Sequence, residues 1–596
     1  MTWPSLAQLV VFLAALAAIT KPLGAFMANV FSGERTFLSR MLAPIERAIY
    51  RTCGIDPAAE QTWTSYAAAT LLFGLVNFVL FYALLRLQGF LPLNPNQFGT
   101  ARAPAGSVPI TPDLAFNIAI SFMTNTSWQS YPGETTLGYL AQMAGVAVQS
   151  FTSAAAGLAV AVALIRAFAS ERTGYRGNFW VDLTRSTLYV LLPISFLGAL
   201  FLCSQGVVQT LAPYRIITTI EGARQAIPMG PVASQESIKL LSSDGGGYFN
   251  ANSAHPFENP APLTSLVEML LMLAVPAGLT YTFGRMVNDH RQGWTLFAVM
   301  FVLFAGGGIV ATLSEQAGNP ILHVAGINSE PGSGQPGGNM EGKEVRFGIA
   351  GSALFSVAAT ATSDGAVNSS HDSFTPLGGL VQLFNLTTGE VIFGGVGTGI
   401  VSMIFMVLVT VFIAGLLVGR TPEYLGKRIE TKEMKMVMLS IVATGAATLL
   451  FAGATFLVAF PKASYWNAAG ALTENLTNRG AHGLSEVIYA NASAVATNGS
   501  AFAGLNANSP WFNLTLGLEM LIGRFLVIIP ALAIAGSLAR KKRLAVTGGT
   551  IPTHGPLFAA LLLGAIVLVT ALTFFPALSL GPIAEHYLMH LGAIAR

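Results

Sequence analysis

The sequence predicts an all-α polytopic membrane protein with about ten transmembrane helices, eight of them in four repeats around a pseudo-fourfold axis. Two observations carry this prediction: the composition, and four similar short segments at nearly constant spacing. The 596 residues are 53% hydrophobic and only 10% Asp, Glu, Lys or Arg, whereas soluble domains carry about 25% charged residues. This composition excludes a soluble enzyme, and a net charge of only +3 leaves no large basic face for nucleic acid.

A helix that crosses the apolar core of a bilayer needs about 20 mostly apolar residues. The chain contains ten such runs, near residues 5–27, 64–86, 137–166, 186–210, 263–284, 293–314, 399–419, 434–460, 514–538 and 556–578. With the N-terminus outside, the short inside loops hold 19 Lys and Arg residues and the longer outside segments hold nine. Because basic residues concentrate on the cytoplasmic side, both termini are expected outside.

Four outside segments each contain an apolar stretch that is too short to cross a membrane. These stretches are Leu114–Met123, Glu236–Leu241, Ile349–Thr360 and Leu484–Ala496. They suit re-entrant half-helices, because irregular backbone at membrane depth is tolerated only where it packs in protein or lines a wet cavity. Each stretch ends in a small polar cluster, so the repeating unit is a full helix, a half-helix, a polar strand and a full helix.

The four polar clusters align with one another. They are Thr124, Asn125, Thr126 and Ser127; Ser243, Asp244, Gly245 and Gly246; Ser363, Asp364, Gly365 and Ala366; and Thr497, Asn498, Gly499 and Ser500. In this alignment the third positions are 119, 120 and 134 residues apart, and Thr126 stands where the other clusters have glycine. A period of this kind indicates one structural unit used four times.

These residue types suit the binding of a monovalent cation. Glycine reaches backbone conformations with positive φ, so four such segments around one axis could replace the hydration shell of an ion with neutral carbonyl oxygens. The partially negative C-terminal ends of the half-helices would favour a cation at that axis. The ligands of such a site would be neutral, whereas Ca²⁺ is better suited by cages of oxygens that include carboxylates. The alternative is that Gly and Ser in outside loops form ordinary turns, and four clusters in register argue against it.

The chain resembles the family of potassium-transporting ATPase A subunits, KdpA, along essentially its whole length. The strings that carry the resemblance are TNTSWQSY (124–131), GGGYFNANSAHPFENP (245–260), GAVNSSHD (365–372), GGVGTG (394–399) and NGSAFAGLNAN (498–508). The family implies four helix–pore loop–helix repeats with one flanking helix at each end. The corresponding divisions are 1–63 with an N-terminal flanking helix and a cytoplasmic loop, 64–166, 167–285, 286–420 and 421–540 as pore repeats, and 541–596 with a C-terminal flanking helix.

The resemblance also implies a function. A member of this family takes up potassium with high affinity: the filter carbonyls of the four clusters bind K⁺ outside, and the ion passes sideways to a P-type ATPase subunit, KdpB. The accessory subunits KdpC and KdpF and membrane lipids are the other implied partners, in a bacterial plasma (inner) membrane. The chain has no GxxxxGK[ST] loop and no Asp-Lys-Thr-Gly motif. We therefore expect no catalytic residue, no bound nucleotide and no metal other than K⁺.

Two single residues stand out near the clusters. Gln129 is similar to the family's glutamine beside the filter. The alternative interpretation is that Gln129 only caps the vestibule. Arg524 lies within the ninth span, where a cation is expensive and usually functional. By resemblance it lines the cavity beneath the filter, whereas the alternative is that its side chain snorkels to the inside interface.

The glycines Gly394, Gly395, Gly397 and Gly399 resemble a phosphate-binding loop. No strand precedes them and a membrane helix follows, which argues against a dinucleotide site. A helix broken in the third repeat fits better, with 377–390 as its other half, and the superfamily uses a loop there as a gate under the filter.

Other charged residues leave two interpretations open. The carboxylates Glu134, Glu258, Asp372 and Glu390 could raise the cation concentration at the outside mouth, or could cap helices and form ion pairs. His586 and His590 have the i, i+4 spacing of metal ligands, but without a third ligand nearby the end of an interfacial helix is expected.

Two other classes of function are alternatives to this interpretation. A stand-alone channel-like potassium transporter of the Trk/Ktr type has the same repeats, but the strings after the second and fourth clusters favour the ATPase subunit. A proton-translocating subunit of a respiratory enzyme needs many mid-span Lys and Glu residues, and the spans contain too few for a proton relay.

Overall fold

The computed structural model describes residues 1–170, 177–324, 326–328, 330–332, 335–458, 476–544 and 551–591. In this part of the chain ten helical segments are long and apolar enough to cross a membrane, which confirms the predicted number. Their helices are α1 (Trp3–Ser32), α3 (Trp63–Leu87), α5 (Val148–Ala169), α6 (Phe179–Arg185) with α7 (Leu192–Ser204), α9 (Pro262–Met286), α10 (His290–Gln316), α14 (Thr398–Leu417), α15 (Thr431–Val458), α18 (Pro510–Leu538) and α19 (Pro556–Leu578). Single π-helical stretches precede α5 (Ala141–Ala147) and join α6 to α7 (Ser186–Leu191).

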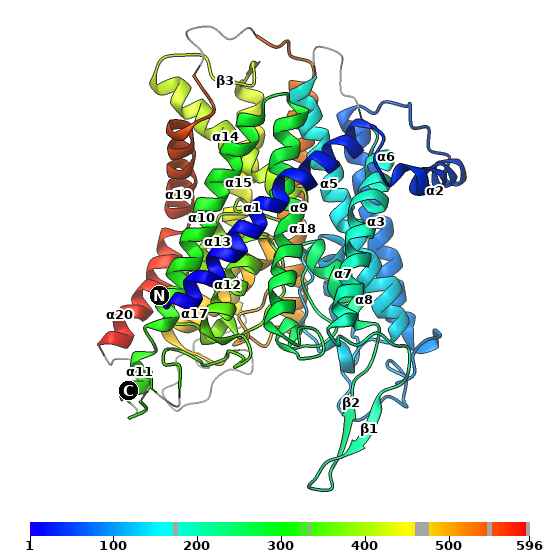
Figure 1. Ribbon diagram of the computed structural model, residues 1–596, viewed down its shortest axis with the longest axis vertical. Helices are drawn as coiled ribbons and strands as arrows, with labels where there is room; N and C mark the ends of the chain where they lie inside the picture. Colours follow the sequence, from blue (N-terminus) through cyan, green and yellow to red (C-terminus); the bar gives the residue numbers. More distant parts are fainter. Residues whose placement is uncertain are drawn as a thin grey trace.

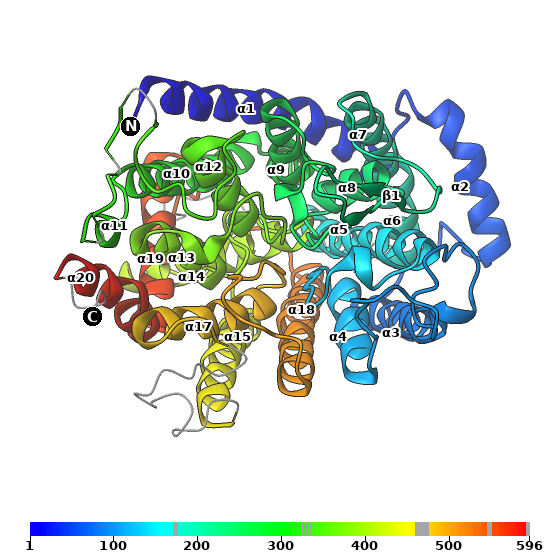
Figure 2. The same ribbon diagram turned by 90° about the horizontal axis from the view of Figure 1, so that it is seen from below.

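Each of the four short apolar stretches is a helix of 10 to 16 residues. These half-helices are α4 (Pro112–Met123), α8 (Val232–Leu241), α12 (Gly348–Ala361) and α17 (Gly480–Val495). Helix α4 shows why such a segment starts where it does: Pro112 occupies the first turn and the Thr111 side chain accepts a hydrogen bond from the Leu114 amide. Figure 2 shows the four half-helices distributed around the centre of the molecule.

The remaining elements lie at the two ends of the bundle. They are α2 (Ser39–Cys53), α11 (Pro320–Val324) and α20 (Ala584–His590), the antiparallel hairpin of β1 (Arg215–Thr218) and β2 (Arg224–Ile227), and the short pair β3 (Glu423–Tyr424) and β4 (Lys427–Arg428). Helix α13 (Pro376–Thr387), in contrast, lies within the bundle beside α10 and α12 (Figure 1). In β1–β2, Arg215 pairs with Ile227. Figure 1 shows this hairpin projecting from the lower end of the bundle, while α2 and β3 lie at the upper end.

Helix α5 forms the centre of the core. Of its most apolar 18-residue stretch 83% is buried, compared with 28% for the flanking helix α1. Gly157 allows the backbone of another segment to approach α5 closely, because a Cβ there would overlap the carbonyl oxygen of Val396. The Tyr66 hydroxyl of α3 also donates a hydrogen bond to the Ala159 carbonyl of α5, at 2.8 Å. Small residues on α5 thus allow segments from several repeats to meet at one axis.

Candidate functional site

The four half-helices end in the same way, and this common ending defines an equivalent position in each filter. At that position a backbone N–H donates to the carbonyl five residues earlier. The four bonds are Thr126 to Ser121 (2.9 Å), Asp244 to Lys239 (3.1 Å), Asp364 to Ala359 (3.1 Å) and Asn498 to Ser493 (2.9 Å). The residue before each of these donors has a left-handed backbone. These residues are Asn125 (φ 62°), Ser243 (47°), Ser363 (57°) and Thr497 (48°).

This register corrects the sequence alignment of the first cluster by one residue. Ser127, not Thr126, stands where the other repeats have Gly245, Gly365 and Gly499. Ser127 has a positive φ of 54°, as Gly245 and Gly499 do. The alignment was wrong because the first cluster contains no glycine to mark the turn. The end of α4 at Met123 and the hydrogen bond from the Thr126 amide to the Ser121 carbonyl reveal the offset.

The filter backbones meet in a closed ring around one axis. A Cβ on Gly245 would overlap the backbone nitrogen of Gly365, and one on Gly365 would lie 2.7 Å from the carbonyl oxygen of Asn498. A Cβ on Gly499 would overlap the Thr126 carbonyl oxygen, which brings the fourth filter against the first. The first filter in turn lies beside the second, since a Cβ on Gly246 would be 3.2 Å from the carbonyl oxygen of Ser127. The sequence-predicted clusters are therefore brought together.

Side chains of the clusters bind neighbouring filters. The Asn125 amide donates to the Ser243 carbonyl at 2.8 Å, and the Ser127 hydroxyl donates to Asp244 Oδ1 at 2.6 Å. On the opposite side of the ring, the Asn498 amide donates to the Ala359 carbonyl at 2.9 Å. All six residues are buried, so these bonds hold the filters at a fixed separation.

Gln129 links the first filter to the segment that follows the second. Its Nε2 donates to the Gly247 carbonyl at 3.1 Å and to the Tyr131 hydroxyl at 3.2 Å, and its Oε1 accepts from the Gly247 amide at 2.9 Å. Gln129 therefore satisfies both backbone groups of Gly247, and its position beside the filter follows from this pairing.

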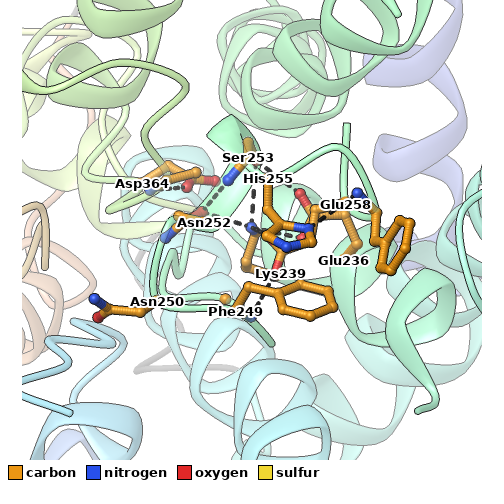
Figure 3. A network of polar contacts seen from close by, with 12 residues as sticks. Glu236, Lys239, Phe249, Asn250, Asn252, Ser253, His255, Glu258 and Asp364 are labelled. Atoms are coloured by element: carbon orange, nitrogen blue, oxygen red, sulfur yellow. Dashed lines mark hydrogen bonds and ion pairs between the residues drawn. The ribbon is translucent and has the colours of Figure 1, made fainter. Parts of the chain in front are cut away.

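A buried lysine, which the sequence analysis did not single out, anchors the segment after the second filter (Figure 3). Lys239 in α8 forms ion pairs with Glu236 at 2.6 Å and Glu258 at 3.1 Å, and it donates to Asn252 Oδ1 at 2.8 Å. Glu258 Oε1 also accepts from the Phe249 amide at 2.7 Å. The polar residues of the string after Gly245 thus fold back onto the half-helix. A lysine within a short apolar stretch was the signal that could have revealed this network.

His255 belongs to the same segment and stacks on the ring of Phe249, with centroids 3.8 Å apart. Burial and the positive charge of Arg346 lower the pKa of His255 to about 4. Its Nδ1 accepts a hydrogen bond from the Phe257 amide at 3.1 Å, as a neutral imidazole does.

The glycine-rich loop between α13 and α14 lies against the filters. Glu390 at its start accepts a hydrogen bond from the hydroxyl of Thr497 in the fourth filter, and a Cβ on Gly395 would be 3.5 Å from Cβ of Ser363 in the third. Glu390 and Gly397 both have positive φ, at 60° and 92°. Helix α14 begins only at Thr398, so the third-repeat helix is broken as the glycines predicted.

Arg524 of α18 lies close to the glycine-rich loop, because both pack against Gly157 of α5. Its Nη2 donates to the Ser153 carbonyl of α5 at 2.7 Å and lies 3.2 Å from where a Cβ on Gly157 would be. A Cβ on Gly397 would overlap the backbone of the same Gly157. Arg524 is only 4% exposed and interacts electrostatically with Glu390 and Asp244. Because its side chain is held inside the bundle, the snorkelling interpretation is wrong.

The four carboxylates near the filters all have specific partners. Glu134 accepts from the Asn250 amide at 3.0 Å, and Asp372 pairs with His482 at 2.8 Å; Glu258 and Glu390 are described above. Burial raises the pKa of Glu134. These contacts favour a structural role over that of free charges at a mouth.

Comparisons with known proteins show the family to which the chain belongs. A family model described as potassium-transporting ATPase A subunit matches residues 10–587. The potassium-transporting ATPase potassium-binding subunit of Solibacter usitatus (strain Ellin6076) is 55% identical over 594 residues, covering 100% of both chains. The subunit of the same name from Mesorhizobium japonicum is 54% identical over 582 residues, covering 98% of both. The crystal structure of the potassium transporter TrkH from Vibrio parahaemolyticus has a TM-score of 0.49 and 14% identity, over 89% of this chain and 98% of that one. A structural similarity that low says nothing about activity. The family match and the two relatives show that the chain belongs to the potassium-transporting ATPase A subunit family.

Proposed function

We propose that this chain is the potassium-binding, non-catalytic subunit of a P-type potassium-transporting ATPase. The observation that carries the proposal is the closed ring of filter backbone at Ser127, Gly245, Gly365 and Gly499, with the C-terminal ends of four half-helices beside it. Carbonyl oxygens in such a ring replace the hydration shell of K⁺, and the helix ends add partial negative charge. K⁺ is the transported substrate.

Selection of K⁺ depends on rigid spacing of the ring. Asn125, Ser127 and Asn498 bind across the filter boundaries, which limits how far the carbonyl groups can close around a smaller ion. The ring is also asymmetric, since Ser127 replaces one of four glycines. We therefore expect unequal oxygen distances around the ion.

We assign the sideways path away from the filters to a cavity beside Glu390. This cavity of about 80 Å³ is lined by 386–391 and by both apolar and hydroxyl-bearing residues of α14, α15, α17, α18 and α19. At ~10–15 Å³ for each water, this volume holds several water molecules or one partly hydrated ion. The positive charge of Arg524 and the packed loop at Gly397 disfavour a cation directly beneath the filters, so the ion leaves through this cavity toward the ATPase subunit, KdpB.

The complex we propose lies in a bacterial inner membrane, with KdpC, KdpF and membrane lipids as further partners. Basic residues concentrate in the loops opposite the filters, which supports both termini outside. ATP hydrolysis belongs to the partner, because this chain carries neither a GxxxxGK[ST] loop nor an Asp-Lys-Thr-Gly motif.

The first test is ATP hydrolysis by the complex purified through a tag on this chain, with and without micromolar K⁺. Co-purification of a P-type ATPase with K⁺-stimulated hydrolysis is the expected result. If the chain purified alone and catalysed K⁺ flux in vesicles without ATP, the stand-alone transporter would replace the proposal.

A further inference from the structure

Three side chains able to bind a metal lie together at the start of α17, beside Gly504 in the segment that follows the fourth filter. Asp372 comes from the segment after the third filter, and His482 and Glu486 come from the first turns of α17. One ligand atom from each lies within 4.8 Å of the other two, and His482 Nε2 is 2.8 Å from Asp372 Oδ1. Imidazole nitrogen and carboxylate oxygen are both ligand types that zinc takes in proteins.

The orientation of His482 suits a metal ligand. Its other ring nitrogen, Nδ1, lies 2.6 Å from Oε1 of Glu585 in α20. A metal-bound histidine almost always donates its second N–H to a carboxylate or carbonyl, which leaves the lone pair on the opposite nitrogen. That opposite nitrogen is Nε2, the atom that faces Asp372.

The carboxylate of Glu486 is also held by hydrogen bonds, and one of its oxygens gives a second, independent indication of a bound cation. Asn478 Nδ2 donates to its Oε1 at 3.0 Å and the Thr477 hydroxyl donates at 3.2 Å. Glu486 is 0% exposed, and its Oε2 has no hydrogen-bond partner among the described residues. A buried carboxylate oxygen without a partner is costly, and a bound cation removes that cost.

We propose that His482 Nε2, Asp372 and Glu486 bind one Zn²⁺ ion, with water completing the coordination. Glu585 acts as the positioning residue for His482. Calcium is less suitable, since it takes six to eight oxygen ligands. The ion would join the segment after the third filter to the start of α17 and, through Glu585, to α20. The site is therefore structural and separate from the K⁺ ring. The competing description is a histidine that carries a proton between Asp372 and Glu585 and binds no metal.

The test measures zinc directly. The complex is stripped with a chelator, equilibrated with equimolar Zn²⁺ and desalted, and the zinc retained per complex is measured by mass spectrometry together with the apparent Tm. The wild type should retain zinc, with Tm raised by about 2–4 °C. His482→Gln and Glu486→Gln should each retain one equivalent fewer. Glu585→Gln, which keeps all three ligands, should weaken zinc binding about 10- to 100-fold.

A matched control comes from the two histidines of α20, of which His586 is half-buried and His590 is exposed. The double variant His586→Gln/His590→Gln removes an i, i+4 pair close in sequence to Glu585 but leaves the proposed ligands intact. It should retain zinc like the wild type. The proposal is overturned if the wild type retains no zinc, if His482→Gln retains as much as the wild type, or if the zinc is lost only in the control. None of these measurements depends on potassium, so they are distinct from tests of the transport proposal.

Discussion

The side-chain amide of Asn125 in the first filter donates a hydrogen bond to the backbone carbonyl of Ser243 in the second, 118 residues away, at 2.8 Å. Asn125 Oδ1 in turn accepts from the Ser153 hydroxyl of α5 at 2.8 Å. One side chain thus connects two filters and a central helix. Asn125 sets the separation of two filters without needing to contact the ion.

Replacing Asn125 with alanine should therefore weaken discrimination more than it weakens transport. We expect Asn125→Ala to lower the ratio of K⁺ to Rb⁺ or Na⁺ stimulation of ATP hydrolysis by about 10-fold, because a buried hydrogen bond of this kind contributes ~1 kcal/mol and leaves the Ser243 carbonyl unpaired when it is lost. Asn250→Ala, at an exposed asparagine of the second repeat, is the control. Unchanged ion ratios in Asn125→Ala would contradict the bracing role.

Gly245 should tolerate no side chain. Its φ is 78°, and a Cβ would overlap the backbone of Gly365. Gly245→Ala should raise the K⁺ concentration for half-maximal ATP hydrolysis at least about 10-fold, and Gly245→Asp should add a charge and reduce selectivity further. Gly306 in α10 has no atom within 4 Å of a Cβ, so Gly306→Ala should behave as the wild type. Normal potassium affinity in Gly245→Ala would refute the filter assignment.

Arg524 should act through its charge. Arg524→Gln keeps a donor for the Ser153 carbonyl but removes the cation beside the loop at Gly397, so an ion can rest beneath the filters. We expect ATP-driven Rb⁺ uptake in vesicles to fall about 10-fold, with little change in the amount of complex. Arg524→Lys should preserve most of the uptake. Equal loss in both variants would indicate a packing role only.

Lys239 should be needed for stability. Removing it leaves the buried carboxylates of Glu236 and Glu258 without their cation, and breaking a buried pair costs ~3–5 kcal/mol. Lys239→Met should lower the apparent Tm of the purified complex by several degrees. Adding Glu258→Gln should recover part of the loss, since one uncompensated charge is then gone. A double variant no more stable than Lys239→Met would show that the two residues are not coupled.

His255 should make the segment after the second filter sensitive to acid. Its pKa is lowered to about 4 in the folded protein, compared with about 6.5 in an unfolded chain. The unfolded state therefore binds the proton more readily, and the contribution of His255 to stability, complete above pH 6.5, is lost as the pH falls toward 4. Between pH 7.5 and 5 the apparent Tm should fall by about 1–2 °C more in the wild type than in His255→Gln. A parallel decrease in both proteins would show that His255 does not titrate in this range.

The sequence predicted the membrane architecture well because that architecture depends on local composition. Ten apolar runs are visible in a linear chain, since each helix must satisfy its backbone within the bilayer by itself. The half-helices were visible for the same reason, as apolar stretches too short to span, and the helix break before Thr398 followed from a cluster of glycines.

The first filter shows where sequence reasoning failed. The string Thr124 to Ser127 aligns plausibly in more than one register, and only the carbonyl that the Thr126 amide reaches distinguishes them. The partners of Lys239 and the place of Arg524 beside Gly397 were hidden for a similar reason. They join residues from separate elements, and no local pattern records such a contact.

The sequence by itself determined the number of helices, the four repeated units and the residue types at the axis. The tertiary structure alone decided that Ser127 takes the place of a glycine, that Asn125 and Asn498 bind across filter boundaries, and that Asp372, His482 and Glu486 meet. Helix formation is governed by hydrogen bonds over four residues and by apolar periodicity. Contacts between filters depend on how four half-helices pack around one axis, which is a property of the whole assembled chain.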